Sequence, residues 1–253
     1  MEIYHISGAG NDFAVMDIRG KTPDLSALAL TLCAITGADG LMALDTSETA
    51  DFRLHFYNAD GHRGEMCGNG ARCICRFAYD LGIAGKDMTV QTDAGLIYAT
   101  RLTESDYRIR LNDPSVIDLS RTNTAAYVEL GDPGIPHAVR ELSALSFDDR
   151  ETLLPEALEL RHHTAFPKGV NVNFFTLTAP DTARVLTYER YVEDYTLACG
   201  TGCSSIAVVL ATQGRLPGDR LTCHCQGGTL TVNLNGGIFL EGPTEILNMF
   251  EHT

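Results

Sequence analysis

Basic side chains are scarce in this chain of 253 residues, which has 19 lysines and arginines against 33 aspartates and glutamates. The formal net charge of -14 argues against nucleic acid or an anionic membrane as partner, because most of the surface would repel them. The chain also lacks any run of about 18 apolar residues, the length that a membrane-spanning helix needs. These absences favour a small molecule as the ligand.

Export signals and low-complexity tracts are missing as well. The segment from Met1 to Ile6 alternates like a strand and lacks the basic and apolar parts of a signal peptide, so we expect a cytoplasmic protein. The eight cysteines are therefore expected to be reduced thiols, for which catalytic or metal roles outrank disulfides. A composition of 44% hydrophobic and 21% charged residues is typical of a soluble globular protein.

Motifs for common cofactors are also absent. The chain has no phosphate-binding glycine loop with lysine, no Gly-x-Gly-x-x-Gly in a dinucleotide context and no evident Schiff-base site. Cys223-His224-Cys225 is the best metal candidate, but no second Cys/His pair follows it at a customary spacing. The sequence predicts neither a cofactor nor a bound metal.

What the chain does contain is a repeated signature. Cys67-Gly68-Asn69-Gly70 and Cys199-Gly200-Thr201-Gly202 lie 132 residues apart (199 minus 67), and each opens an apolar, helix-like stretch. Three further pairs keep this register: Gly82 with Gly214, Asp87 with Asp219, and Gly95 with Gly227. A repeat over about half the chain indicates a duplicated domain.

The hydrophobic pattern predicts an α+β fold of two pseudo-symmetric domains, each with strands rolled around a buried central helix and with the active site in the cleft between them. We expect domains over 1–112, joined by the C-terminal segment 242–253, and over 113–241, with the boundary in the turn at Asn112 to Ser115. The expected helices are 24–35 with Thr22 as a cap, 71–82, 148–161 and 203–213. The expected strands are 2–6, 13–18, 51–57, 89–92, 96–101, 107–111, 127–130, 170–177, 183–190, 220–225, 229–234 and 238–241.

The repeated turns suit proton transfer. A thiol just before a helix lies at the positive end of the helix dipole, which favours the thiolate and lowers the pKa towards neutral. The glycines let backbone N–H groups approach a carboxylate closely. Two facing turns would hold one carboxylate with a sulfur on either side of the adjacent carbon, so one cysteine removes a proton and the other delivers one.

Six motifs follow one another along the chain: Gly8 to Phe13, Tyr57 to Gly61, Met66 to Cys73, Gly169 to Asn173, Glu189-Arg190, and Leu197 to Gly202. In this order they resemble the diaminopimelate epimerase family, the pyridoxal-phosphate-independent amino-acid epimerases of lysine and cell-wall synthesis. The resemblance covers nearly the whole chain. It implies a cofactor-independent isomerase that converts LL-diaminopimelate to meso-diaminopimelate, and it is compatible with a homodimer.

The same resemblance implies roles for individual residues. Cys67 and Cys199 match the two catalytic bases. The backbone cradle for the reacting carboxylate matches Gly68, Asn69, Gly200 and Thr201. Positions that hold the substrate near its reacting amino group match Asn11 and Glu189, and positions that recognise the distal end match Asn58, Asn171 and Arg190, of which Arg190 suits a distal carboxylate.

Two departures from the family pattern leave the substrate open. Gly134-Ile135-Pro136-His137 has isoleucine where the family usually has an asparagine that touches the distal group, and the stretch after Arg190, 191–196, is bulkier than the usual glycine-rich one. Tyr191 or Tyr195 could supply a hydroxyl in place of the lost asparagine contact, and His137 is as compatible with a local hydrogen bond as with a site role. Alternatives are the same mechanism on another amino acid such as histidine, a cysteine-independent isomerase, or a non-catalytic ligand-binding protein of this fold.

Overall fold

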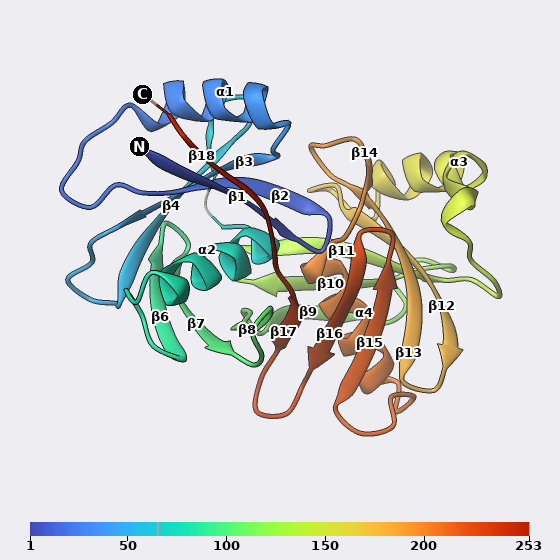
Figure 1. Ribbon diagram of the computed structural model, residues 1–253. Helices are drawn as coiled ribbons and strands as arrows, with labels where there is room; N and C mark the ends of the chain where they lie inside the picture. Colours follow the sequence, from blue (N-terminus) through green and yellow to red (C-terminus); the bar gives the residue numbers. More distant parts are fainter. Residues whose placement is uncertain (65, 253) are drawn as a thin grey trace. The chain divides into compact units, whose positions relative to one another are not determined.

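A computed structural model describes residues 1–64 and 66–252 and divides the chain into two compact units (Figure 1). Unit 1 comprises Met1–Arg110 and Glu241–Thr253, and unit 2 comprises Leu111–Leu240. All eight cysteines are free thiols. Within the described ranges, no helix combines the length and the apolar character that a membrane crossing requires.

Unit 1 is a sheet built around two crossover helices. Its elements are β1 (Glu2–Gly8), β2 (Asn11–Asp17), α1 (Leu25–Thr36), β3 (Gly40–Asp45), β4 (Phe52–Asn58), β5 (Arg63–Gly64), α2 (Gly68–Asp80), β6 (Asp87–Thr92), β7 (Gly95–Arg101), β8 (Asp106–Arg110) and β18 (Glu245–Glu251). The hairpin β1–β2 is followed by α1, which connects β2 to the parallel strand β3. Strand β4 pairs antiparallel with β3, and α2 then connects β4 to the parallel strand β6. The C-terminal strand β18 pairs with β1.

Unit 2 has the same layout. Its elements are β9 (Pro114–Asp118), β10 (Ala126–Gly131), β11 (Gly134–Glu141), the 3-10 turn Phe147–Asp149, α3 (Arg150–Arg161), β12 (Asn171–Ala179), β13 (Thr182–Glu189), β14 (Asp194–Thr196), α4 (Gly200–Thr212), β15 (Arg220–Cys225), β16 (Gly228–Asn233) and β17 (Phe239–Pro243), which ends beyond the unit boundary. The hairpin β10–β11 is followed by α3 and the parallel strand β12. Strand β13 pairs antiparallel with β12, and α4 leads to the parallel strand β15.

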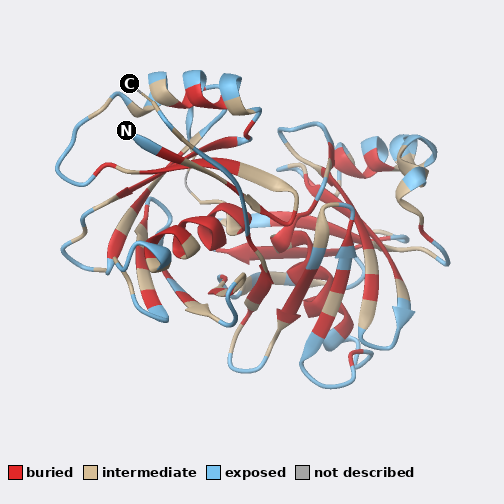
Figure 2. Cartoon of the chain, in the orientation of Figure 1, coloured by how far each residue is buried: buried red, intermediate tan, exposed pale blue. Residues whose placement is uncertain are grey.

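The two units therefore repeat one topology strand by strand. Helices α2 and α4 have 13 residues each, and the 132-residue offset maps Gly68–Asp80 onto Gly200–Thr212. Figure 2 shows both helices as mostly buried. In α4, every residue from Gly202 to Leu210 is buried, so this helix is buried around its whole circumference. The predicted α+β class, with a buried helix in each of two similar halves, is confirmed.

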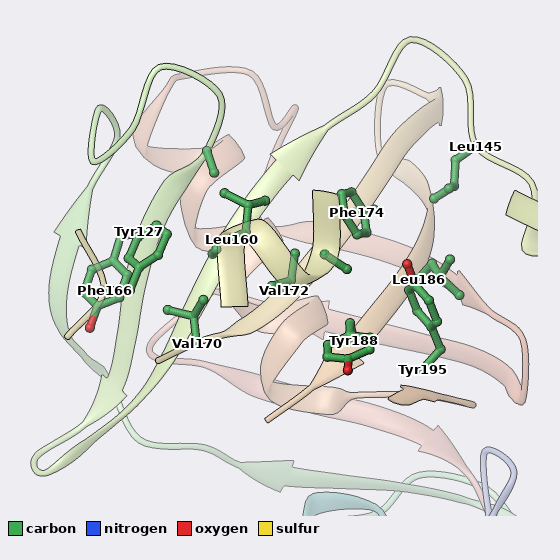
Figure 3. Packing of buried hydrophobic residues seen from close by; sticks show 13 residues of the cluster. Tyr127, Leu145, Leu160, Phe166, Val170, Val172, Phe174, Leu186, Tyr188 and Tyr195 are labelled. Carbon is green, nitrogen blue, oxygen red and sulfur yellow. The ribbon is translucent and has the colours of Figure 1, made fainter. Parts of the chain in front are cut away.

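The outer helices cover separate cores. In unit 1, Leu32 of α1 packs on Ile3, Met16 and Leu41 of the sheet. In unit 2, Leu160 of α3 packs on a cluster that includes Tyr127, Phe166, Val172, Phe174, Leu186, Tyr188 and Tyr195 (Figure 3). The rings of Tyr127 and Phe166 are stacked with their centroids 5.5 Å apart. Each sheet is thus held between an outer helix and a central one.

Element boundaries differ from the predictions where glycine or proline is involved. Helices α2 and α4 begin three residues earlier than expected, so the glycines of the repeated signature form the first helical turn. The cap of α1 is Asp24, whose carboxylate accepts a hydrogen bond from the backbone N–H of Ala27 at 3.1 Å, and Thr22 has no such role. The sequence did not predict strand β11, because Pro136 interrupts its pattern. The turn predicted at 112–115 is shorter than expected, since strand β9 begins at Pro114.

The failure to predict strand β3 has a different cause. Its residues Gly40 to Leu44 are all buried, because β3 lies inside the sheet with β2 parallel on one side and β4 antiparallel on the other. Such a strand reads as a continuous apolar run without alternation, which periodicity cannot separate from a helix.

Candidate active site

Cys67 occupies the cap position before α2. Its backbone is extended (φ -129°, ψ 123°), its carbonyl accepts the first helical hydrogen bond from Ala71 at 2.7 Å, and its thiol does not cap the helix. The side chain is half-buried. The first N–H groups of a helix have no intrahelical partner, so this turn presents donors beside a thiol.

Cys199 occupies the equivalent position before α4. Its backbone is again extended (φ -122°, ψ 108°), its carbonyl accepts from Cys203 at 3.0 Å, and its thiol makes no capping hydrogen bond. The sulfur lies 3.5 Å from the hydroxyl oxygen of Thr201, and only 7% of the residue is exposed. Both predicted catalytic cysteines thus stand in the same local geometry, one in each unit.

The charge state of Cys199 differs from the sequence prediction. Burial raises the pKa of the Cys199 thiol well above its usual value, and the carboxylate of Glu189 raises it further. The nearby Thr201 hydroxyl and the backbone N–H of Gly202 oppose this shift, but their effects are smaller. The expectation that this pKa lies near neutral is therefore wrong: burial and the Glu189 charge raise it, and Cys199 is a protonated thiol at neutral pH.

Asn11 and Asn69 are brought together in unit 1. Asn11 begins β2, Asn69 lies in the first turn of α2, and the amide nitrogen of Asn69 donates to the side-chain oxygen of Asn11 at 2.6 Å. Asn69 is almost fully buried and Asn11 is half-buried. Asn58, at the end of β4, is exposed, and its amide donates to the carbonyl of His62 at 3.4 Å.

Asn171 and Arg190 are brought together in unit 2. The side-chain oxygen of Asn171, at the start of β12, accepts a hydrogen bond from the backbone N–H of Arg190 at 2.8 Å. The guanidinium of Arg190 donates to the carbonyl of Lys168 at 2.9 Å and lies 4.5 Å from the centre of the Tyr191 ring. Glu189, the last residue of β13, therefore stands beside an arginine whose backbone and side chain are both held.

The unusual stretch after Arg190 forms a tight turn. Tyr191 and Glu193 adopt left-handed backbone conformations with φ of 73° and 53°, which favour glycine. Arg161 of α3 donates to the carboxylate of Glu193 at 2.6 Å and so fastens the turn to the outer helix. Tyr191 is exposed, whereas Tyr195 belongs to the apolar core of unit 2 and is unsuited to supplying a hydroxyl to a ligand.

His137 and Asn173 form a buried pair in unit 2. Both are fully buried, and the amide nitrogen of Asn173 donates to Nδ1 of His137 at 3.1 Å. Burial, together with the charge of Arg190, lowers the pKa of His137 to about 3, so the ring is neutral and carries its proton on Nε2. Ile135, by contrast, is partly exposed on the same strand.

The Cys-His-Cys segment does not converge on one point. Cys223 and Cys225 are buried on one face of β15, and the sulfur of Cys225 lies 3.6 Å from that of Cys203 in α4. His224 is exposed on the opposite face, where its ring pairs with Thr229 at 3.0 Å. In the part of the chain that the structure describes, no group of three or more histidine, cysteine or acidic side chains is arranged to hold a metal ion.

Sequence reasoning assigned no role to several residues that contact the predicted site. Arg72 is a fully buried arginine that donates to Asn69, Asp39 accepts from Asn11, and the backbone of Lys168 holds Arg190. Arg72 had a detectable signal, because it is a charged residue between apolar residues, Ala71 and Cys73, close to the repeated signature. Asp39 had none, since it is an ordinary exposed carboxylate in a loop.

The chain is similar in sequence to known diaminopimelate epimerases. A family model described as diaminopimelate epimerase matches residues 3–113 and 132–244. The chain is 39% identical to the diaminopimelate epimerase of Chlorobaculum tepidum over 249 residues, which cover 94% of this chain and 96% of that protein. It is 35% identical to the diaminopimelate epimerase of Flavobacterium psychrophilum over 265 residues, which cover 100% of both proteins.

Solved structures share the fold at low sequence identity. A PhzF-family phenazine biosynthesis protein from Bacillus anthracis aligns with a TM-score of 0.72 and 14% identity, covering 100% of this chain and 99% of that one. A hydroxyproline epimerase from Agrobacterium vitis aligns with a TM-score of 0.69 and 16% identity, covering 99% of this chain and 91% of that one. At such identities the likeness concerns the α+β fold alone.

Proposed function

Because the chain belongs to the diaminopimelate epimerase family, and is thus an isomerase of the racemase and epimerase class, we propose that it converts LL-diaminopimelate to meso-diaminopimelate with two cysteines as acid and base. Diaminopimelate is the compound in the names of the relatives, and its interconversion would place the enzyme in lysine biosynthesis. The reaction requires removal of the α-proton from one face of the carbon and delivery of a proton to the other.

The observation that carries the proposal is the equivalence of Cys67 and Cys199. Each is an uncapped thiol with an extended backbone at the start of a 13-residue buried helix. The other cysteines of these helices do not recur at the 132-residue offset, since Cys73, Cys75 and Cys203 align with Ser205, Ala207 and Ala71. Two positioned thiols, in contrast, are what a two-base inversion needs.

The two thiols start in different states in this mechanism. Cys199 is protonated because of its burial, so it is the acid that delivers a proton when Cys67 acts as the base. The substrate carboxylate lies at the first-turn N–H groups around Gly68, Asn69, Gly200 and Thr201. These donors stabilise the negative charge that develops as the α-proton leaves, which lowers the barrier without an electron-sink cofactor.

Polar side chains that are fixed by hydrogen bonds within the protein would recognise the rest of the substrate. Asn11 and Glu189 take the ammonium group at the reacting centre. Asn58, Asn171 and Arg190 take the distal end, where the guanidinium of Arg190 pairs with the second carboxylate. Arg190 suits this role because Asn171 holds its backbone at 2.8 Å and the Lys168 carbonyl holds one terminal nitrogen at 2.9 Å.

The test is incubation in deuterated water with LL-diaminopimelate, meso-diaminopimelate, histidine and proline, followed by mass spectrometry. We expect α-deuterium to enter the diaminopimelate product, whereas substrate recovered early keeps its proton, which is the signature of two separate bases. Deuterium uptake by histidine alone would overturn the substrate assignment and leave the thiol mechanism standing. If none of these amino acids takes up deuterium, the epimerase proposal fails.

Variants test the thiols directly. Cys67→Ser and Cys199→Ser should each lower the rate by several orders of magnitude, because a serine hydroxyl is too weak an acid to act as the base at neutral pH. Cys75→Ala is the matched control, since Cys75 lies in α2 but outside the turn and is fully buried. Near-normal rates in either serine variant would contradict the two-cysteine mechanism.

A further inference from the structure

Four polar side chains of unit 1 form one continuous hydrogen-bonded chain through Asn69 and Asn11. The guanidinium of Arg72 donates to Oδ1 of Asn69 at 2.9 Å, and Nδ2 of Asn69 donates to Oδ1 of Asn11 at 2.6 Å. Nδ2 of Asn11 then donates to Oδ2 of Asp39 at 3.1 Å. This series of hydrogen bonds runs from the fully buried guanidinium of Arg72 to the exposed carboxylate of Asp39.

The two ends of this chain have fixed hydrogen-bonding polarity. A guanidinium can only donate, and a carboxylate can only accept, whereas each amide between them has a donating and an accepting side. Turning the Asn69 amide would place its NH2 group against Arg72 and its oxygen against the Asn11 oxygen. The only arrangement that satisfies every link is the observed one, so the end groups determine the direction of both amides.

Both ends are themselves held in place. Arg72 reaches back along α2, where its guanidinium also donates to the carbonyl of Gly68 at 3.3 Å, inside the repeated turn. The carboxylate of Asp39 also accepts from the backbone N–H of Asp12 at 3.2 Å. The backbone of Asp39 donates to the Asp12 carbonyl at 2.8 Å and accepts from Ala59 at 3.1 Å, so this exposed residue is tied to two neighbouring segments.

We infer that Arg72 and Asp39 are positioning residues of the epimerase. They set the direction of the Asn11 and Asn69 side-chain amides, so that the oxygen of Asn11, and not its nitrogen, lies on the side of Asn69. This inference rests on the proposed function, in which Asn11 binds the ammonium group of an amino acid. An ammonium group only donates, so it must meet an acceptor. An amide in the reverse direction would present N–H groups and repel the substrate.

Asp39 gives the sharper test, because it is exposed and its substitution leaves the core unchanged. Asp39→Ala removes the acceptor for Asn11 and should lower kcat/KM for the amino-acid substrate by about tenfold. Asp39→Asn keeps an acceptor oxygen at the same place, and the Arg72 end still dictates the direction, so it should recover most of that loss. Asp87→Ala is the matched control, since Asp87 is also exposed and accepts a side-chain hydrogen bond, from Thr100 at 2.8 Å.

A double-mutant cycle separates positioning from a general structural effect. If Asp39 acts through Asn11, Asp39→Ala should change kcat/KM by no more than about twofold in an Asn11→Ala background. The same tenfold loss in both backgrounds, or an unchanged kcat/KM in Asp39→Ala, would overturn the inference. Arg72→Lys, which keeps a donor, should retain more activity than Arg72→Met; if the Arg72 variants do not fold, the cycle on Asp39 decides alone.

A readout without turnover keeps this inference distinct from the proposed function. In nitrogen-15 NMR spectra, the side-chain NH2 signals of Asn11 are assigned from the Asn11→Ala variant. Asp39→Ala should shift these signals and speed their exchange with water, whereas Asp87→Ala should not. Insensitive Asn11 signals refute the positioning role, while absence of deuterium incorporation in the wild type refutes the epimerase.

Discussion

At the scale of single residues, His137 shows how burial sets a charge state. The ring is fully buried, and its Nδ1 accepts a hydrogen bond from Asn173, whose amide also donates to the carbonyls of Ala138 and Asn171 at 3.0 and 3.2 Å. A protonated ring would lose this hydrogen bond and face the charge of Arg190. The neutral ring therefore helps to hold the start of β12, where Asn171 contacts the backbone of Arg190.

This neutral histidine predicts a loss of stability in mild acid. Since the folded pKa of about 3 lies below the ordinary 6.5, the unfolded chain binds a proton that the folded chain does not. The free energy of unfolding therefore falls as pH drops below 6.5, by up to about 1.4 kcal/mol per pH unit. Urea unfolding at pH 6.5 and pH 5 should show a decrease about 2 kcal/mol larger in the wild type than in His137→Gln.

The control is His62→Gln, because His62 is exposed. Its pH dependence should match that of the wild type. Equal pH dependence in the wild type and in His137→Gln would contradict the assignment of a neutral, buried ring.

The sequence indicated the residues with distinctive chemistry more clearly than it indicated the residues that surround them in the fold. A duplicated signature singles out Cys67 and Cys199 from the other thiols, and both lie at the start of a central helix, as the signature indicates; their catalytic role stays a prediction. The protonation of Cys199 was not predictable, because it depends on how completely the folded chain removes water from the sulfur. Asp39 was unpredictable for a similar reason, since only the parallel pairing of β2 with β3 brings it to Asn11.

At the scale of elements, the last glycines of the two signatures meet different neighbours. A Cβ atom on Gly202 would lie 2.1 Å from the side-chain oxygen of Asn173, which also accepts from Thr187 at 3.0 Å. A Cβ atom on Gly70 would lie 1.8 Å from the terminal methyl of Met42. The first neighbour is fixed by several hydrogen bonds, whereas a methionine end can move.

Alanine at these two positions should therefore have unequal effects. Gly202→Ala should lower the free energy of unfolding by about 1 to 3 kcal/mol, because Asn173 must leave its hydrogen bonds or the helix must shift. Gly70→Ala should be nearly neutral, since a displacement of Met42 is offset by the gain of about 1 kcal/mol that alanine brings to a helix. Urea unfolding followed by circular dichroism measures both. Equal losses, or a larger loss at Gly70, would contradict this account.

The same glycines explain where element prediction failed. Glycine has low helix propensity, so the sequence placed the starts of both central helices after the signatures. In the fold, Gly68–Asp80 and Gly200–Thr212 begin with these glycines, and in α4 larger residues would collide with Leu240 at Gly200 and with Asn173 at Gly202. Helix existence and length followed from the apolar pattern, whereas the boundaries followed from tertiary packing.

At the scale of the whole molecule, buried thiols are distributed over the central helices of both units. Cys73 and Cys75 lie in α2, and Cys199 and Cys203 lie at or in α4, all of them buried. Burial raises the pKa of Cys73 to about 12 and also raises the pKa of Cys75. Burial raises the pKa of Cys199, and a hydrogen bond with Cys223 is the largest cause of the raised pKa of Cys203. Each unit therefore contains thiols that must stay protonated in the folded state.

This distribution predicts destabilisation in alkali. A thiol whose folded pKa lies above its ordinary value of 9.0 binds a proton in the folded chain that the unfolded chain has already lost. Its contribution to stability is complete below pH 9 and declines as pH rises towards the folded pKa, by up to about 1.4 kcal/mol per pH unit for each buried thiol. The free energy of unfolding should therefore fall steeply between pH 9 and 10.5 for both units, measured by urea unfolding under reducing, anaerobic conditions.

The double variant Cys73→Ala/Cys75→Ala isolates the contribution of α2. Its stability at pH 8 should be lower because two buried sulfurs are lost, but its decline above pH 9 should be shallower by about 2 to 3 kcal/mol per pH unit. The remaining slope belongs to α4 and to buried tyrosines such as Tyr107, whose pKa burial raises to about 12. A variant that loses stability as steeply as the wild type would show that the α2 thiols do not control alkaline unfolding, and that the tyrosines or unit 2 do.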